Sequence, residues 1–220
     1  MLRLNYLQLT EALLTTLQRF NYTLLTPSIT NEPCATVKVA LPIKDRDAFL
    51  QKLVKETNFQ VIQSRFDTTI LTADLPKDQL VTLELHHHFH VDRLTYLNLA
   101  EVLQHRQKSN GIYVPNLEHL LEFSILNSFL NEQGLSRTII RQFEDLHVFL
   151  QEGLLDYFNQ KYDTYFSSWY ELADYKETID NHFRKQLKQF PANRFVNRMR
   201  LGWVNMKQLM KKSAVFSYFL

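Results

Sequence analysis

Apolar residues in the first half of the chain recur at two spacings, and each spacing predicts a type of element. Two stretches, 4–20 and 44–57, have the spacing of an amphipathic helix, and Asp45 is the expected N-cap of the second. The inward face of this second helix is predicted to consist of Phe49, Leu50, Leu53 and Val54. Alternating apolar runs predict strands at 22–26, 36–41, 59–64, 68–73 and 80–88. The order of elements in this half is therefore α-β-β-α-β-β-β.

The pattern changes after His90, where longer helical periods predominate. Helices are predicted at 94–107, 117–132, 135–151, 154–166, 171–189 and 192–212, with breaks at Asn110-Gly111, Gly134 and Gly153. Strands followed by a run of helices are typical of an α+β protein. We expect a small mixed sheet with flanking helices in a domain over 1–92. An all-helical domain over 93–220, ending in a basic amphipathic helix, is expected to follow.

Composition removes several classes of function. The chain has 220 residues, of which 45% are hydrophobic, so it can bury a full core. Its four glycines are isolated from one another, which disfavours glycine-rich phosphate loops. Cys34 is the single cysteine, so an intrachain disulfide and a cysteine-rich zinc site are excluded. A polar N-terminus and the lack of an apolar run of membrane-spanning length predict a cytoplasmic protein.

The segment 81–90 carries one carboxylate, Glu84, and four histidines within five residues. On a continuous strand, Glu84, His86, His88 and His90 would share one face, which makes the three histidines candidate metal ligands. A metal-dependent hydrolase is the function that such a site would give. Residues two apart on one strand are roughly 7 Å apart, however, which is too wide for all of them to reach one ion. Histidines at a wet strand end are the simpler interpretation.

Three short motifs between residues 80 and 150 point to a known family. They are a strand reading Leu83-Glu84-Leu85-His86 with a hairpin and helix after it, the step Gly111-Ile-Tyr-Val-Pro-Asn-Leu-Glu118, and an Asp-Leu run at Asp145–Leu150. Over about 35–150, the chain resembles the uncharacterised bacterial nucleotidyltransferase family of the polymerase-β superfamily. The resemblance implies a nucleotidyltransferase-like fold and a setting in bacterial cell-surface polysaccharide synthesis.

The resemblance also implies which residues catalysis would need. In that superfamily, two Mg²⁺ ions are held by a D-x-D pair, which follows a Gly-Ser turn, and by a third carboxylate on a neighbouring strand. Glu84 matches the third position. The strand Thr36–Leu41 should carry the pair, but it has no acid, and Lys38 lies where a negative charge is required. We therefore expect a degenerate, non-catalytic member without a cofactor; the alternative is an active Mg²⁺-dependent enzyme that uses Glu84.

The C-terminal segment is a separate electrostatic region. No acidic residue follows Asp180, whereas nine of the 25 basic residues do, which leaves residues 1–180 with 16 basic against 23 acidic side chains. The predicted helix 192–212 has one apolar face between basic flanks. It is expected either to pack on its own domain or to bind a protein partner or the anionic inner face of the cell membrane; nucleic acid is disfavoured. The residues of this surface are Arg194, Arg198, Arg200, Trp203, Lys207, Lys211 and Lys212.

Overall fold

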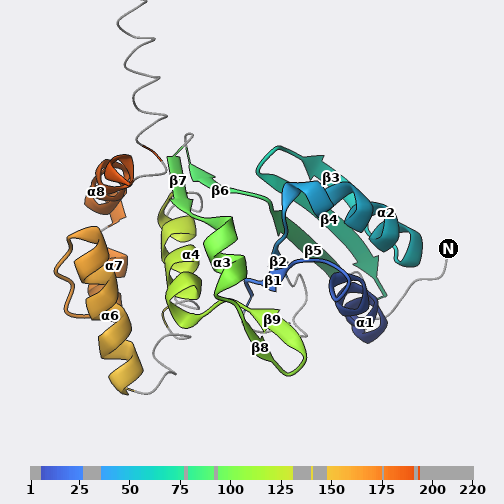
Figure 1. The fold of residues 1–220 in the computed structure, drawn as a ribbon, viewed down its shortest axis with the longest axis horizontal. Helices are drawn as coiled ribbons and strands as arrows, with labels where there is room; N and C mark the ends of the chain where they lie inside the picture. Colours follow the sequence, from blue (N-terminus) through green and yellow to red (C-terminus); the bar gives the residue numbers. More distant parts are fainter. Residues whose placement is uncertain are drawn as a thin grey trace, which may run out of the picture.

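The structure, a computed structural model, describes residues 6–26, 36–76, 79–91, 94–130, 140, 148–174, 176–190 and 193. Its N-terminal part is a mixed sheet with two helices, in the predicted order. The elements are α1 (Tyr6–Leu17), β1 (Thr23–Leu24), β2 (Thr36–Ala40), the short 3₁₀ helix η1 (Ile43–Asp45), α2 (Arg46–Glu56), β3 (Gln60–Ser64), β4 (Thr68–Leu75) and β5 (Gln79–His86). The α+β architecture with a small mixed sheet and flanking helices is confirmed (Figure 1).

The five strands lie in the order β1-β2-β5-β4-β3. Strands β3, β4 and β5 are joined by tight connections and pair antiparallel, whereas β2 lies parallel to β5. A parallel neighbour needs a long crossover, and α2 with the β3–β4 hairpin supplies it. This crossover places Lys38 directly beside Glu84 in the register.

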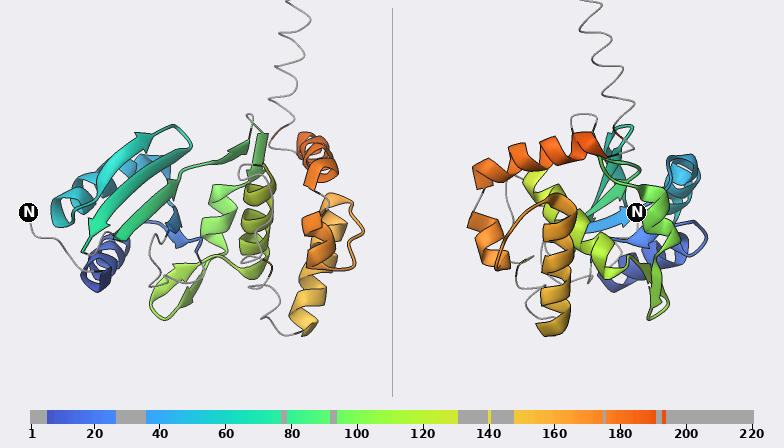
Figure 2. Two further views of the ribbon diagram at one scale, coloured as in Figure 1. Left: turned by 180° about the vertical axis from the view of Figure 1, so that it is seen from behind. Right: turned by 60° about the vertical axis from the view of Figure 1, so that its left-hand side comes forward.

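The two faces of the sheet differ because side chains alternate along each strand. One face is apolar, and its residues Val37, Val39, Leu71, Leu83 and Leu85 form a buried cluster with the inner leucines of α1 and with Phe49 and Leu53 of α2. The other face is polar and partly accessible to water. Its residues include Thr36, Lys38, Thr72, Thr82 and Glu84. In the left view of Figure 2, seen from behind, the strands of the sheet lie in front of α2.

The predicted N-cap position of α2 is confirmed, but its capping hydrogen bond is missing and one residue of the predicted inward face was wrong. Asp45 occupies the N-cap position, but it has αR backbone angles and its side chain makes no capping hydrogen bond, because the 3₁₀ turn η1 leads directly into the helix. Val54 is 42% exposed and does not belong to the inward face. The spacing of apolar residues predicts the helix correctly, but it does not show which residues at the edge of the apolar face are buried against the sheet.

The region after β5 begins with two hairpins, not with the long helix predicted over 94–107. Strand β6 (Phe89–Val91) pairs with β7 (Leu94–Leu97), and α3 (Leu99–Gln104) starts where the Asn98 side chain accepts a hydrogen bond from the Ala100 N–H at 3.0 Å. Strands β8 (Gln107–Ser109) and β9 (Ile112–Val114) form the second hairpin. Its turn is Asn110-Gly111, where both φ angles are positive, as a type I′ turn requires.

Helices α4 (Leu117–Leu130), α6 (Val148–Tyr162), α7 (Trp169–Asp174) and α8 (Lys176–Gln189) follow. The break predicted at Gly153 was wrong, since α6 runs through this residue. Buried side chains of these helices form a second core with the β6–β7 hairpin, whereas β9 packs on the core of the sheet. The β8–β9 hairpin lies after residue 93 in the chain but packs on the core formed before residue 92. The predicted domain boundary at 92/93 stays a prediction.

Candidate functional site

The strongest sequence candidate, Glu84, lies on the polar face of the sheet near its centre. Parallel pairing of β2 and β5 brings the Lys38 ammonium to 3.9 Å from the Glu84 carboxylate. The His86 ring, two residues along the same strand, lies 3.5 Å from the same carboxylate oxygen, which is a long electrostatic contact. The first cation beside Glu84 is thus a side chain of the protein itself.

Burial and neighbouring groups act on Glu84 in opposite directions. Burial raises the pKa of its carboxyl group, but the interaction with His86 and the positive charge of Lys38 together outweigh that effect and lower the pKa below its usual value. Glu84 is therefore ionised at neutral pH, and Lys38 compensates its charge. A single carboxylate that is already paired has little remaining charge to attract a divalent cation.

The position expected for the D-x-D pair can now be read from the register. Thr36 lies beside Thr82 and Lys38 lies beside Glu84, so residues 36, 38, 82 and 84 share the polar face. Residues 36 and 38 carry a hydroxyl and an ammonium group on this face, so Glu84 is the one carboxylate among these four residues. Within the part of the chain that the structure describes, no group of three or more His, Cys, Asp or Glu residues could hold a metal ion.

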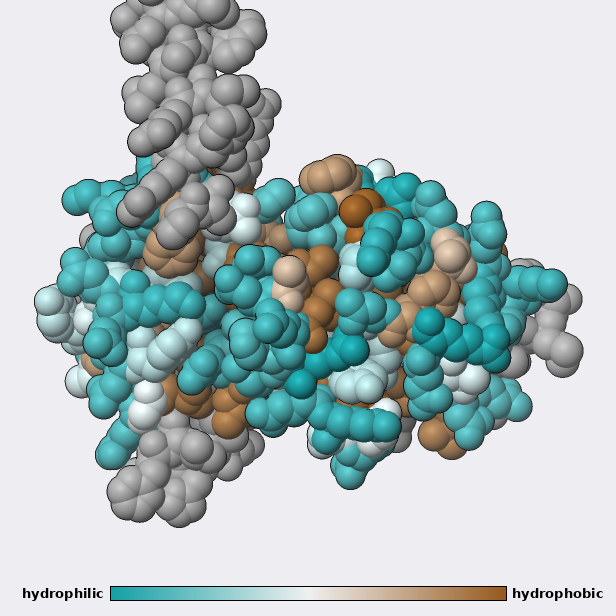
Figure 3. Space-filling view, viewed as in Figure 1, coloured by the Kyte–Doolittle hydropathy of each residue, from teal (hydrophilic) through white to brown (hydrophobic). Residues whose placement is uncertain are grey.

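The four histidines do not continue along one strand as predicted, because β5 ends at His86 and the chain bends at His87 before β6. His86 packs against Phe89 and Phe123. His88 and His90 lie in a separate column of stacked rings with Phe66, at centroid distances of 4.5 and 5.3 Å. This column is near the β3–β4 turn, where apolar side chains gather on the surface (Figure 3). The bend therefore separates His86 from the other two proposed metal ligands.

His87, which the sequence argument set aside, is fully buried and ties three strands together. Its Nδ1–H donates to the Leu41 carbonyl at 2.8 Å, so Nε2 of the neutral ring accepts from the Thr69 hydroxyl at 3.0 Å. The backbone N–H of His87 also donates to the Asp67 carbonyl at 2.7 Å. His87 therefore fixes the point at which the chain leaves the sheet.

Acid should destabilise the fold through His87. Burial lowers the pKa of this imidazole below its ordinary 6.5 and outweighs the hydrogen bond to Leu41, which raises it. The unfolded chain therefore takes up a proton at a higher pH than the folded chain, so stability falls as the pH drops below about 6.5. We expect His87→Asn, whose amide can still donate to Leu41, to flatten this dependence. Urea unfolding between pH 7.5 and 5 measures it, and an unchanged slope in the variant would contradict the assignment.

A second polar cluster, which the sequence reasoning missed, lies between α4 and α6. Glu122 is 1% exposed, forms an ion pair with Lys161, and accepts a hydrogen bond of 2.7 Å from the Tyr157 hydroxyl. Burial and this hydrogen bond raise the pKa of Tyr157, and burial lowers the pKa of the nearby His119. A carboxylate inside the apolar run of 120–130 was the available signal, because such a residue is seldom buried without a partner.

The predicted basic surface cannot be placed. All seven of its residues, from Arg194 to Lys212, lie outside the described residues, as does most of the predicted helix 192–212. Among the helices that are described, none is long and apolar enough to cross a membrane. Comparison with known proteins found no matching family model and no matching curated protein.

Proposed function

We propose that this chain is a nucleotidyltransferase-like protein that no longer performs two-metal phosphoryl transfer and acts by binding. Its partner would be a protein or an anionic membrane surface, in an accessory role in bacterial cell-surface polysaccharide synthesis. The observation that supports this proposal is the Lys38–Glu84 pair in the register of β2 and β5.

The physical argument rests on the local charge. Two Mg²⁺ ions placed close together need several carboxylates, which offset the charge of the metals and orient the triphosphate. Here Glu84 contributes one negative charge and the adjacent Lys38 contributes one positive charge, so the polar face is close to neutral at this point. Thr36, two residues before Lys38 on the same face of β2, offers only a neutral hydroxyl. This part of the sheet therefore offers a metal–triphosphate complex neither the carboxylate ligands that the Mg²⁺ ions need nor the negative charge that would offset theirs.

We expect the purified protein to show no response to Mg²⁺ and nucleoside triphosphates. Calorimetric titration with Mg²⁺ and each of the four common triphosphates should give no binding heat, and Tm should stay unchanged. Glu84→Gln should behave like the wild type because Glu84 holds no metal. Saturable binding that Glu84→Ala abolishes would instead establish the alternative, an active Mg²⁺-dependent enzyme that uses Glu84.

The binding surface proposed at 192–220 rests on the sequence alone. Its support is the excess of basic residues after Asp180, combined with an apolar face that contains Trp203. This composition suits attraction to phosphate headgroups followed by insertion of the apolar face.

A further inference from the structure

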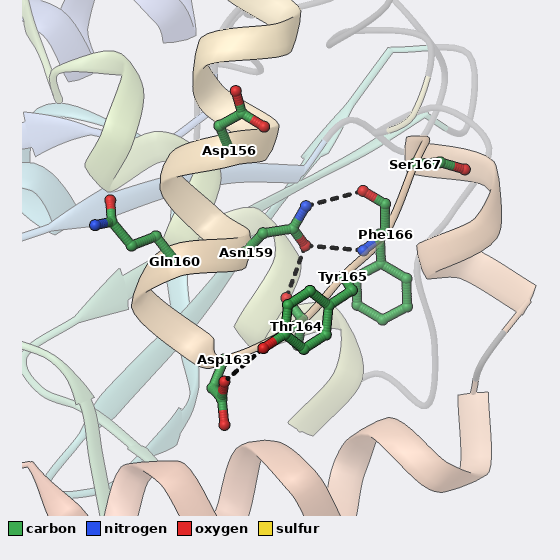
Figure 4. A pocket seen from close by; sticks show the side chains of 8 residues that line it. All are labelled: Asp156, Asn159, Gln160, Asp163, Thr164, Tyr165, Phe166 and Ser167. Carbon is green, nitrogen blue, oxygen red and sulfur yellow. Dashed lines mark hydrogen bonds between the residues drawn. The ribbon is translucent and has the colours of Figure 1, made fainter.

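A hollow of about 600 Å³ opens beside the C-terminal end of α6, far along the chain from Glu84. One continuous segment lines it, running from the last turns of α6 into the loop before α7 (Figure 4). The volume falls within the range of small-molecule sites, roughly 300–1,000 Å³. The lining residues are Asp156, Asn159, Gln160, Asp163, Thr164, Tyr165, Phe166 and Ser167.

Two side chains hold the loop that forms one wall: Glu171 accepts two hydrogen bonds from Ser167, and Asn159 makes three more. Asn159 accepts hydrogen bonds from the Thr164 hydroxyl at 2.8 Å and from the Phe166 N–H at 3.0 Å, and its amide donates to the Phe166 carbonyl at 2.8 Å. The Thr164 N–H also donates to the Asn159 carbonyl at 2.9 Å. Because these hydrogen bonds already hold the loop in place, binding a ligand here would lose less conformational entropy than binding at a flexible loop.

Other lining groups have unused hydrogen-bonding capacity. The side chains of Asp156 and Gln160 make no hydrogen bond or ion pair with the described part of the chain, and the Asp163 side chain has one long contact, at 3.5 Å, with the Tyr165 hydroxyl. The ring of Tyr165 is 89% exposed. Exposing the apolar face of an aromatic ring to water is unfavourable in the free protein. The same face offers a flat surface on which a ligand can stack, next to groups that accept hydrogen bonds.

The charges of the lining restrict the class of ligand. Two of the eight residues are carboxylates and none is Lys, Arg or His, so a phosphate or a nucleotide would be repelled. Carboxylates accept hydrogen bonds from hydroxyl groups, and the electron-rich face of tyrosine attracts the slightly positive C–H groups of a sugar ring.

We propose that this hollow is a binding site for a neutral saccharide chain, in which one sugar stacks on Tyr165 and donates a hydroxyl hydrogen bond to Asp163, and a neighbouring sugar donates to Asp156, about 10 Å away along α6. The site deepens the proposed binding function by naming a class of ligand. Its lining excludes activated, phosphate-bearing sugars, so the ligand would be a free saccharide or part of a glycan chain.

Electrophoresis of the full-length protein in native gels that contain dextran, β-glucan or galactomannan tests the site. We expect at least one of these neutral glycans to retard the wild type, and Tyr165→Ala to weaken its binding by about tenfold. Asp156→Asn should weaken binding severalfold while preserving the shape of the lining. Tyr170→Ala is the matched control, because Tyr170 is another exposed tyrosine, 53% accessible, outside the lining.

The outcomes separate this site from the rest of the proposed function. Absence of retardation in all three gels, or equal retardation of the wild type and Tyr165→Ala, would overturn the sugar site. Competition by the matching free disaccharide would show that the sugar unit itself is recognised, whereas retardation without competition would indicate a longer glycan chain. Neither result changes the Mg²⁺–triphosphate titration, which depends on residues of the sheet, so the two proposals can fail separately.

Discussion

The double substitution Thr36→Asp/Lys38→Asp should create a divalent-cation site on the polar face of the sheet, where the natural side chains offer only the Glu84 carboxylate. It places two carboxylates on the face of β2 that lies beside Glu84, and it removes the ammonium that now compensates Glu84. Without metal, three adjacent carboxylates repel one another, and we expect a loss of roughly 1–2 kcal/mol of stability. Bound metal should reverse this loss, because oxygen ligands from neighbouring strands would then converge on one ion.

Thermal unfolding with and without Mn²⁺ or Mg²⁺ measures the effect. At a metal concentration near 100 times Kd, binding stabilises the folded state by about 2.7 kcal/mol. For a chain of this size, that corresponds to a rise in Tm of roughly 5–10 °C. The wild type should show no comparable rise.

Two controls define the site. Thr36→Asn/Lys38→Asn removes the lysine charge without adding carboxylates, so it should not respond to metal. Adding Glu84→Gln to the double aspartate variant should abolish most of the response. If the aspartate variant folds and millimolar Mn²⁺ leaves its Tm unchanged, Glu84 does not occupy the third carboxylate position that the resemblance assigns to it.

Removing the partner of the buried carboxylate between α4 and α6 should have the second large effect. Lys161→Met leaves Glu122 buried, with the Tyr157 hydroxyl, at 2.7 Å, as its remaining hydrogen-bond partner among the described residues. Breaking a fully buried pair costs about 3–5 kcal/mol. Because the Lys161 side chain is 35% exposed, water relieves part of this penalty, and we expect a loss of roughly 2–3 kcal/mol in urea unfolding at pH 7.5.

A second substitution tests whether the unpaired charge causes this loss. Glu122→Gln in the Lys161→Met background removes the charge, and the amide can still accept from Tyr157. We expect the double variant to regain at least half of the lost stability. If it is no more stable than Lys161→Met alone, the packing of the lysine stem, and not its charge, accounts for the loss.

The sheet could be predicted from the sequence because its strands alternate clearly and are separated by polar breaks. The hairpins after β5 were harder, since β6 to β9 are only three or four residues long and their apolar residues also fit a helical period. Asn110-Gly111 is nevertheless the strongest short-range hairpin signal, and it was interpreted as a simple break between helices. At Gly153 the opposite error occurred, since a break was predicted and α6 continues through the residue. One glycine destabilises a packed helix by only about 1 kcal/mol, which is too little to end it.

The candidate site divides in the same way. Lys38 and Glu84 could be related from the sequence because both lie on strands whose alternation fixes their faces. The Glu122–Lys161 pair could not, because it joins two helices whose relative placement depends on packing rather than on local pattern. His87 was missed although alternation along β5 places it on the same side as Leu83 and Leu85, the apolar face of the sheet, where it is buried.

The parallel pairing of β2 with β5 has a consequence for the order in which the chain folds. Strands β3, β4 and β5 can pair through the short connections between them. The pairing of β2 with β5 can form only later, because α2 and the β3–β4 hairpin separate the two strands in the sequence. Contacts between distant parts of the sequence carry a larger loop-closure cost and form slowly. Lys38 therefore reaches Glu84 late. During synthesis, β2 emerges from the ribosome well before β5, so it can pair with β1, but its other edge stays unpaired until β5 follows.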